Sequence, residues 1–263
     1  MQIIKRIRSD GENVKSAVYE IEQRLSNRIL GAFPEGWEAD RITGSVLTDL
    51  QALFENKRLH VHGDVLRSKW SVYGLTDETS RRFGTAAFLI KIRYHDGQEV
   101  EGVAYVDAQA KDPGRNTFSA LRMDHTRRLS SAAPHAQLLL YDYDVIAGMA
   151  LPVQPEALVG SSPVGWDYWA PYTHGAVVPA HLALSLGTRD TGLYKVGLPF
   201  SYQLCYRYLF GLDLDYSRPS VEIVRGLRAQ KGRPKFVALV SVTRGGSAPG
   251  EDFNVNLEGY SRL

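Results

Sequence analysis

Three polar side chains close an otherwise apolar segment and are the first candidates for chemistry. Residues 103–106 read Val-Ala-Tyr-Val, and Asp107, Gln109 and Lys111 follow at alternate positions. Alternate residues of a β-strand share one face, so these side chains are expected to point the same way. An ammonium beside metal-binding oxygens suits the negative charge that develops at phosphorus during phosphodiester hydrolysis. A solvated strand end is the alternative, because a three-residue polar pattern is common by chance.

The elements that must position this trio can be read from the apolar spacing. Apolar runs at 87–94 and 100–109 flank an Asp-Gly turn and predict a β-hairpin. Helical spacing precedes it over 14–32 and, more briefly, over 46–54. A helix from Asn116 or Thr117 to about Ser130 and a strand over 137–143 are expected after it. This order predicts an α/β fold in which helices flank a mixed central sheet.

The second half of the chain has a looser pattern and is separated at a boundary near residue 153. Residues 154–175 read as a long irregular connection whose aromatic side chains would stack on bases or anchor a loop. Helices are expected at 176–187 and 199–210, and a strand at 236–243. Residues 154–263 would therefore form a C-terminal α+β elaboration or second subdomain.

Glu22 lies on the apolar stripe of the first helix, beside Val18 and Leu25. A carboxylate on an inward-facing stripe costs free energy unless a cation or a hydrogen-bond donor meets it. The alternative is that Glu22 sits at the edge of the stripe and reaches solvent. The spacing alone leaves both interpretations open.

Basic residues gather in two segments. No acidic residue occurs between Glu222 and Glu251, and arginines also surround the helix expected after Lys111. Such segments could follow phosphates, with an affinity that falls as salt rises, or form solvated charged loops. The candidate nucleic-acid contacts are Arg122, Arg128, Arg225, Arg228, Lys231 and Arg233.

Composition narrows the class of protein. The 263 residues contain 44% hydrophobic residues, and 31 Lys+Arg against 29 Asp+Glu give a net charge of +2, which is ordinary for a globular chain. A single cysteine, Cys205, excludes an internal disulfide and a cysteine-based zinc site. No apolar run has the length of a membrane span, and the first residues lack the apolar core of a signal peptide. A cytoplasmic protein without a membrane partner is expected.

Several short motifs, taken in order, resemble one known family. Glu22-x-x-Leu25-Ser26, then Phe83-Gly84-Thr85, Gln109-Ala-Lys111 and Leu138-Leu-Leu-Tyr141 look like the PD-(D/E)XK nuclease superfamily. The likeness is to its bacterial branch with Gln-Ala-Lys in place of Glu-x-Lys. It spans residues 13–153, so residues 1–153 would form a restriction-endonuclease-like core. Each motif is short, and specificity comes from their order and spacing.

The resemblance implies a role for each matching residue. Glu22 and Gln109 would help to hold Mg²⁺ or Mn²⁺, which are hard cations that prefer oxygen ligands. Lys111 would orient the attacking water and balance charge at the phosphate. The substrate would be DNA rather than RNA, in restriction or anti-phage defence. A second copy of the chain or a regulatory protein would be further partners.

Position 86 departs from the family pattern. The family carries an acidic residue in Gly-x-Asp at the start of the first hairpin strand, whereas Gly84-Thr85 is followed here by Ala86. The resemblance therefore places Ala86 at a catalytic and metal-binding position, where the family has its acidic residue. Three explanations of this alanine are open. The nuclease core has decayed, or Asp77 or Glu78 takes the place of the missing acid, or an engineered change replaced an aspartate at position 86.

Two main hypotheses of function follow from these motifs. The first is a metal-dependent DNA endonuclease, present here in an inactive form because of Ala86. The second is a non-catalytic nucleic-acid-binding or assembly protein with a decayed nuclease core. An RNA-directed toxin with the same core is a third.

Overall fold

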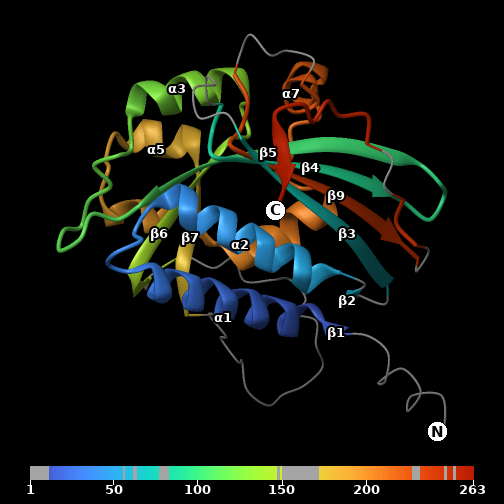
Figure 1. Cartoon of the computed structure of the whole chain (residues 1–263), viewed down its shortest axis with the longest axis horizontal. Coiled ribbons are helices and arrows are strands. Elements are labelled where there is room, and N and C mark those ends of the chain that lie inside the picture. Colours follow the sequence, from blue (N-terminus) through green and yellow to red (C-terminus); the bar gives the residue numbers. More distant parts are fainter. Residues whose placement is uncertain are drawn as a thin grey trace, which may run out of the picture.

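The computed structural model describes residues 12–55, 57–61, 64–76, 83–146, 149, 172–226, 232–245, 248–250 and 253–263. It shows an α/β protein in which helices flank a mixed open sheet (Figure 1), as the sequence predicted. Nine strands follow one another across the sheet in the order β1 (Glu12–Asn13), β2 (Arg58–Val61), β3 (Asp64–Leu75), β9 (Phe236–Arg244), β4 (Ala86–Arg93), β5 (Glu99–Ala110), β6 (Gln137–Ile146), β7 (Thr173–Pro179) and β8 (Leu198–Pro199). A tenth, β10 (Tyr260–Arg262), pairs with β3.

The predicted hairpin is confirmed. Strands β4 and β5 are antiparallel with Ala86 opposite Val106 and Arg93 opposite Glu99. The chain then crosses over through α3 (Met123–Ala132) and returns as β6, which runs parallel to β5. The carboxyl ends of β5 and β6 therefore lie side by side at the same end of the sheet.

The C-terminal half belongs to the same sheet as the N-terminal half. Strand β9 lies between β3 and β4, antiparallel to the former and parallel to the latter. Strands β7 and β8 extend the other end beyond β6. A boundary near residue 153 therefore does not separate two sheets, because strands from both halves hydrogen-bond to each other.

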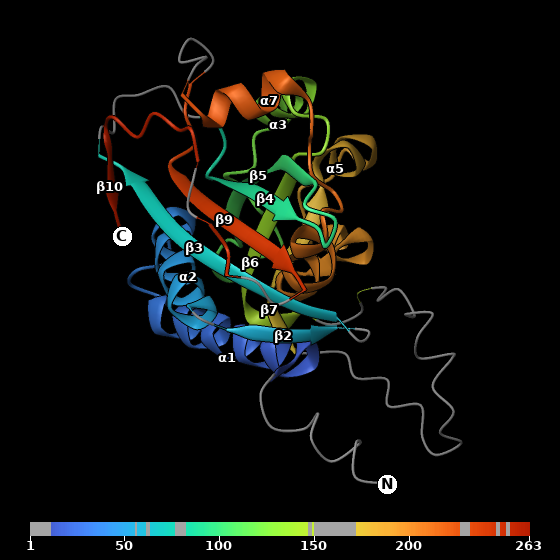
Figure 2. The ribbon, with the colours of Figure 1, turned by 90° about the vertical axis from the view of Figure 1, so that its right-hand side faces the viewer.

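Helices cover both faces of the sheet. Helices α1 (Val14–Ala32) and α2 (Ala39–Phe54) lie on one face, and α3, α5 (Ala180–Leu186) and α7 (Arg218–Val224) lie on the other (Figure 2). Alternation along β5 sends Ala104, Val106 and Ala108 into the core under α1 and α2. Val103 and Tyr105 enter the opposite core.

The structure differs from the sequence prediction in three elements. The helix expected from residue 116 or 117 begins at Met123, because Thr117 and Ser119 hydrogen-bond to the Asp112 carboxylate in a loop. Residues 173–179 form strand β7 before α5 starts. The helix expected at 199–210 is divided into α6 (Phe200–Tyr202), the π-helical turn η2 (Gln203–Arg207) and the 3-10 turn η3 (Tyr208–Phe210).

Two expectations remain, on the connection at 154–175 and on membrane spans. Most of the connection at 154–175, with its tryptophans, lies outside the described residues. Within the described part of the chain, no helix combines the length and apolarity that crossing a membrane requires.

Candidate functional site

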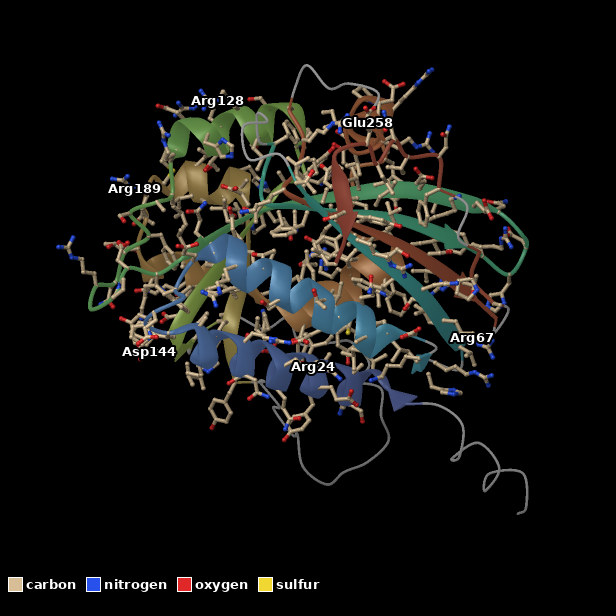
Figure 3. The ribbon with its side chains drawn as sticks, viewed as in Figure 1. Arg24, Arg67, Arg128, Asp144, Arg189 and Glu258 are labelled. Carbon is tan, nitrogen blue, oxygen red and sulfur yellow. The ribbon has the colours of Figure 1, made fainter. Side chains whose placement is uncertain are left out.

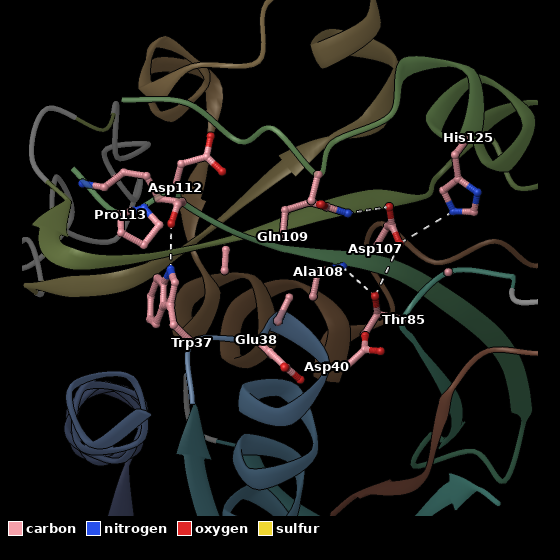
Figure 4. Close-up of a pocket in the computed structure, with 15 residues that line it drawn as sticks. Trp37, Glu38, Asp40, Thr85, Asp107, Ala108, Gln109, Asp112, Pro113 and His125 are labelled. Carbon is pink, nitrogen blue, oxygen red and sulfur yellow. Dashed lines mark hydrogen bonds and ion pairs between the residues drawn. The ribbon is translucent and has the colours of Figure 1, made fainter. Parts of the chain in front are cut away.

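A cavity of about 500 Å³ lies at the carboxyl end of β5 (Figure 4). Its walls come from three places: the end of β5 with the start of β4, the beginning of α2, and α3. The polar and aromatic residues that line it are Trp37, Glu38, Asp40, Thr85, Asp107, Gln109, Lys111, Asp112 and His125. Ligand sites are common at the carboxyl ends of strands in open α/β sheets.

Asp107 connects the polar side chains of this cavity. One of its carboxylate oxygens accepts a hydrogen bond from Gln109 Nε2 at 3.1 Å. The other accepts from Thr85 Oγ1 at 3.4 Å and lies 3.7 Å from His125 Nε2. Asp107 is only 7% exposed, so its charge is held by these neighbours rather than by bulk water.

His125 is the titratable partner of Asp107. The neighbouring Asp107 carboxylate raises the pKa of His125 above its ordinary value, against the opposing effects of partial burial and of the Arg128 and Arg122 charges. The Asp107 carboxylate and the charges of Arg122 and Arg128 therefore act on the imidazole in opposite directions. The raised pKa favours the cationic form of His125 at the border between the cavity and α3.

Lys111 contributes to the wall of the cavity, but its charge is engaged elsewhere. The ammonium lies 2.5 Å from Asp142 Oδ1 and 2.8 Å from Asp144 Oδ2, and the side chain is 4% exposed. Its backbone carbonyl accepts a hydrogen bond of 2.7 Å from Trp37 Nε1. Burial alone would lower the pKa of Lys111, but its hydrogen bonds to the two aspartates raise it.

Glu22 does not line the cavity. It lies on α1, is 5% exposed, and its Oε1 accepts a hydrogen bond from the Ser201 hydroxyl. Oε2 has no hydrogen-bond partner among the residues described. Burial raises the pKa of Glu22 to about 7, although the hydrogen bonds from Ser201 lower it. The interpretation of Glu22 as a solvent-reaching edge residue is wrong.

Ala86 does not reach the cavity either. It is 1% exposed and packs in the core under α1 and α2. Alternation places its neighbour Thr85 at the cavity instead, where Thr85 Oγ1 also accepts a hydrogen bond of 3.0 Å from the Ala108 amide. The structure thus brings Gln109 and Lys111 to one cavity and leaves Glu22 and Ala86 outside it.

The described residues do not fit the divalent cation that the family resemblance implies. They contain no group of three His, Cys, Asp or Glu side chains placed to hold a metal ion. Asp40 at the cavity pairs with Lys235 at 2.7 Å, and Asp112 is engaged by Thr117 and Ser119. Asp77 and Glu78, the proposed substitutes for an acid at position 86, lie outside the described part of the chain.

The candidate basic residues fall into distinct environments. Arg122, directly before α3, and Arg128, on α3, are both exposed, and Arg128 projects outward on the side of α3 and α5 (Figure 3). Arg225 pairs with Glu101 at 2.8 Å, and Arg233 donates a hydrogen bond to the Glu258 carbonyl. Arg228 and Lys231 are outside the described residues.

Sequence reasoning missed part of this constellation. His125, Thr85, Glu38 and Trp37 were not among the residues proposed for the site. Asp107 was a candidate from the start, because it shares the alternation of Gln109 and Lys111. No local pattern marks His125, because α3 brings it to Asp107 only after the crossover.

Comparisons with known proteins add no family. No protein-family model, no curated protein and no solved structure matches the chain.

Proposed function

We propose that this protein binds DNA through the exposed face of α3, with the phosphate backbone passing the mouth of the β5 cavity. The observation that carries the proposal is the position of Arg122 and Arg128. Both are exposed, both act electrostatically on His125, and His125 lines the cavity beside Gln109.

The chemistry of these groups supports phosphate binding. Guanidinium groups match phosphate oxygens with paired hydrogen bonds, and neither Arg122 nor Arg128 forms an ion pair with another residue in the described part of the chain. The cavity itself is lined by the carboxylates of Glu38, Asp40 and Asp107, which repel a phosphate. The backbone would therefore run along α3 and over the cavity rather than into it.

A second candidate is hydrolysis of a phosphodiester at the same cavity, as in a metal-dependent DNA endonuclease. It is favoured by the meeting of Gln109 and Lys111 at one cavity, within the element order of the nuclease superfamily that the sequence resembles. Against it stand the ion pairs of Lys111 and the lack of a three-ligand metal group among the described residues. We place it second for these reasons.

One set of samples tests both candidates. Fluorescently labelled duplex DNA is titrated with the protein at several salt concentrations, and anisotropy gives the affinity. The double variant Arg122→Ala/Arg128→Ala should bind more weakly and lose about two units of the slope of log affinity against log salt. Arg225→Ala is the matched control, because Glu101 already neutralises that guanidinium.

The same mixtures, incubated with Mg²⁺ or Mn²⁺ and run on a denaturing gel, report on cleavage. Intact DNA is expected. Cleavage that disappears in Asp107→Asn would put the second candidate first. Equal salt slopes for the double variant and the Arg225→Ala control would overturn binding along α3, and tighter binding of RNA than DNA would overturn the choice of DNA.

A further inference from the structure

A second cavity, of about 310 Å³, shares no lining residue with the β5 cavity. It lies where the start of β6, the end of β7, α5 and η2 meet. Its apolar wall consists of Val177, Pro179, Val196 and Leu198, and its polar wall of His135, Gln137, His181, Gln203, Arg207 and Asp213. A cavity of this volume, with convergent polar groups on one wall and apolar side chains on the other, has room for a small molecule.

The polar wall is fixed by contacts around Asp213. The Arg207 guanidinium donates two hydrogen bonds to the Asp213 carboxylate, and Gln203 Nε2 donates a third at 2.8 Å. Asp213 has φ 57° and is the only non-glycine residue with positive φ in the described chain. Such backbone costs free energy and persists where surrounding contacts hold it, often at ligand sites. Gln203 and Arg207 also belong to the π-helical turn η2, a rare element frequently found at functional sites.

Several hydrogen-bond donors of this wall are left for a ligand. The rings of His135 and His181 are at the surface, and neither has a hydrogen bond or ion pair with another described residue. Gln137 accepts a hydrogen bond from the Tyr208 hydroxyl through its side-chain oxygen, which leaves its amide nitrogen as a donor. Arg207 uses Nε and Nη2 on Asp213, so its Nη1 is not engaged by that carboxylate.

We propose that this cavity binds a small phosphate ester. The phosphate would lie between His135, His181 and Arg207, and the organic part against Val177, Val196 and Leu198. Arg207 and Asp213 pair with each other, and the two imidazoles add further hydrogen-bond donors to the site. Imidazole and guanidinium N–H groups donate hydrogen bonds to phosphate oxygens, and the Asp213 carboxylate holds the guanidinium in a fixed orientation.

Isothermal titration calorimetry on the full chain without DNA tests this proposal. The probes are adenosine 5′-monophosphate, inorganic phosphate and adenosine. We expect saturable binding of the monophosphate, weaker binding of phosphate and none of adenosine. The variant His135→Ala/His181→Ala should bind the monophosphate about tenfold more weakly or worse. Both histidines are exposed, so the fold should be kept, which circular dichroism checks.

His95→Ala is the matched control, because His95 is an exposed histidine in the β4–β5 turn, away from both cavities. It should bind the monophosphate with unchanged affinity. An equal loss in this control, or no saturable binding of the monophosphate to the unsubstituted protein, would overturn the site. Phosphate binding as tight as that of the monophosphate would overturn the contact with the apolar wall. The result is independent of DNA binding, which is read with Arg122→Ala/Arg128→Ala.

Discussion

The ammonium of Lys111 lies 2.5 Å from a carboxylate oxygen of Asp142, and both side chains are 4% exposed. The second carboxylate oxygen of Asp142 accepts a hydrogen bond of 2.9 Å from the Tyr194 hydroxyl. Asp144, which is largely exposed, makes the other ion pair of Lys111. The positive charge at the end of β5 is thus neutralised inside the fold, so Lys111 stabilises this region rather than offering a free cation to the cavity.

Removing one member of this pair should therefore destabilise the protein. In Lys111→Ala the Asp142 carboxylate stays buried without its cation, and we expect the free energy of unfolding to fall by about 3 kcal/mol or more. Asp144→Ala removes only the exposed partner and should cost less than about 1 kcal/mol. Urea unfolding followed by circular dichroism measures both. Similar values for the two variants would show that the buried pair contributes no more than a surface one.

The pair of Asp107 and His125 leads to a prediction about titration. The Asp107 carboxylate raises the pKa of His125, so Asp107→Asn should lower it. Proton NMR of the His125 ring across pH measures the change, and Asp124→Asn is the control because Asp124 is exposed on the same helix and pairs with Arg127. The proton is held more tightly in the folded state, so this pair stabilises the fold at acidic pH and loses that effect as pH rises past the pKa of His125. An equal shift in Asp124→Asn would contradict the assignment to Asp107.

The local parts of the fold could be predicted from the sequence. Period-two alternation around Asp96-Gly97 predicted β4 and β5, and helical spacing predicted α1 with its end at Ala32. The position of β9 between β3 and β4 could not be predicted, since its partners are more than a hundred residues away in the chain. Strand pairing at that distance depends on tertiary packing, which no local pattern contains.

The candidate site was predicted only in part, because local patterns again do not contain tertiary packing. Gln109 lies at the cavity because alternation along one strand is a local property. The resemblance placed position 86 at the site, but Thr85 lies at the cavity and Ala86 in the core, because a shift of one residue along a strand moves a side chain to the other face. Glu22 was ambiguous because the helical wheel gives a direction and not the depth of burial.

Cys205 should be inert to thiol reagents in the folded protein. It is fully buried, and burial raises the pKa of its thiol well above the ordinary range, so almost no thiolate forms at neutral pH. An aromatic disulfide reagent should react with it at the rate of unfolding and promptly in denaturant. Rapid reaction without denaturant would show that the core formed by α6 and η2 opens locally.

Glu22 gives the clearest dependence of stability on pH. Its pKa is about 7 in the folded protein and 4.5 ordinarily, so folding takes up a proton between these values. The contribution of Glu22 to the free energy of unfolding is therefore highest below pH 4.5 and falls as pH rises towards 7, by about 3 kcal/mol in total.

Glu22→Gln tests this dependence, because it keeps the shape of the side chain without the charge. It should unfold at higher urea than the unsubstituted protein at pH 8, and the gap should close towards pH 4.5. Glu35→Gln, at an exposed site, should follow the unsubstituted protein. A gap for Glu22→Gln that stays constant with pH would mean that folding does not change the pKa of Glu22.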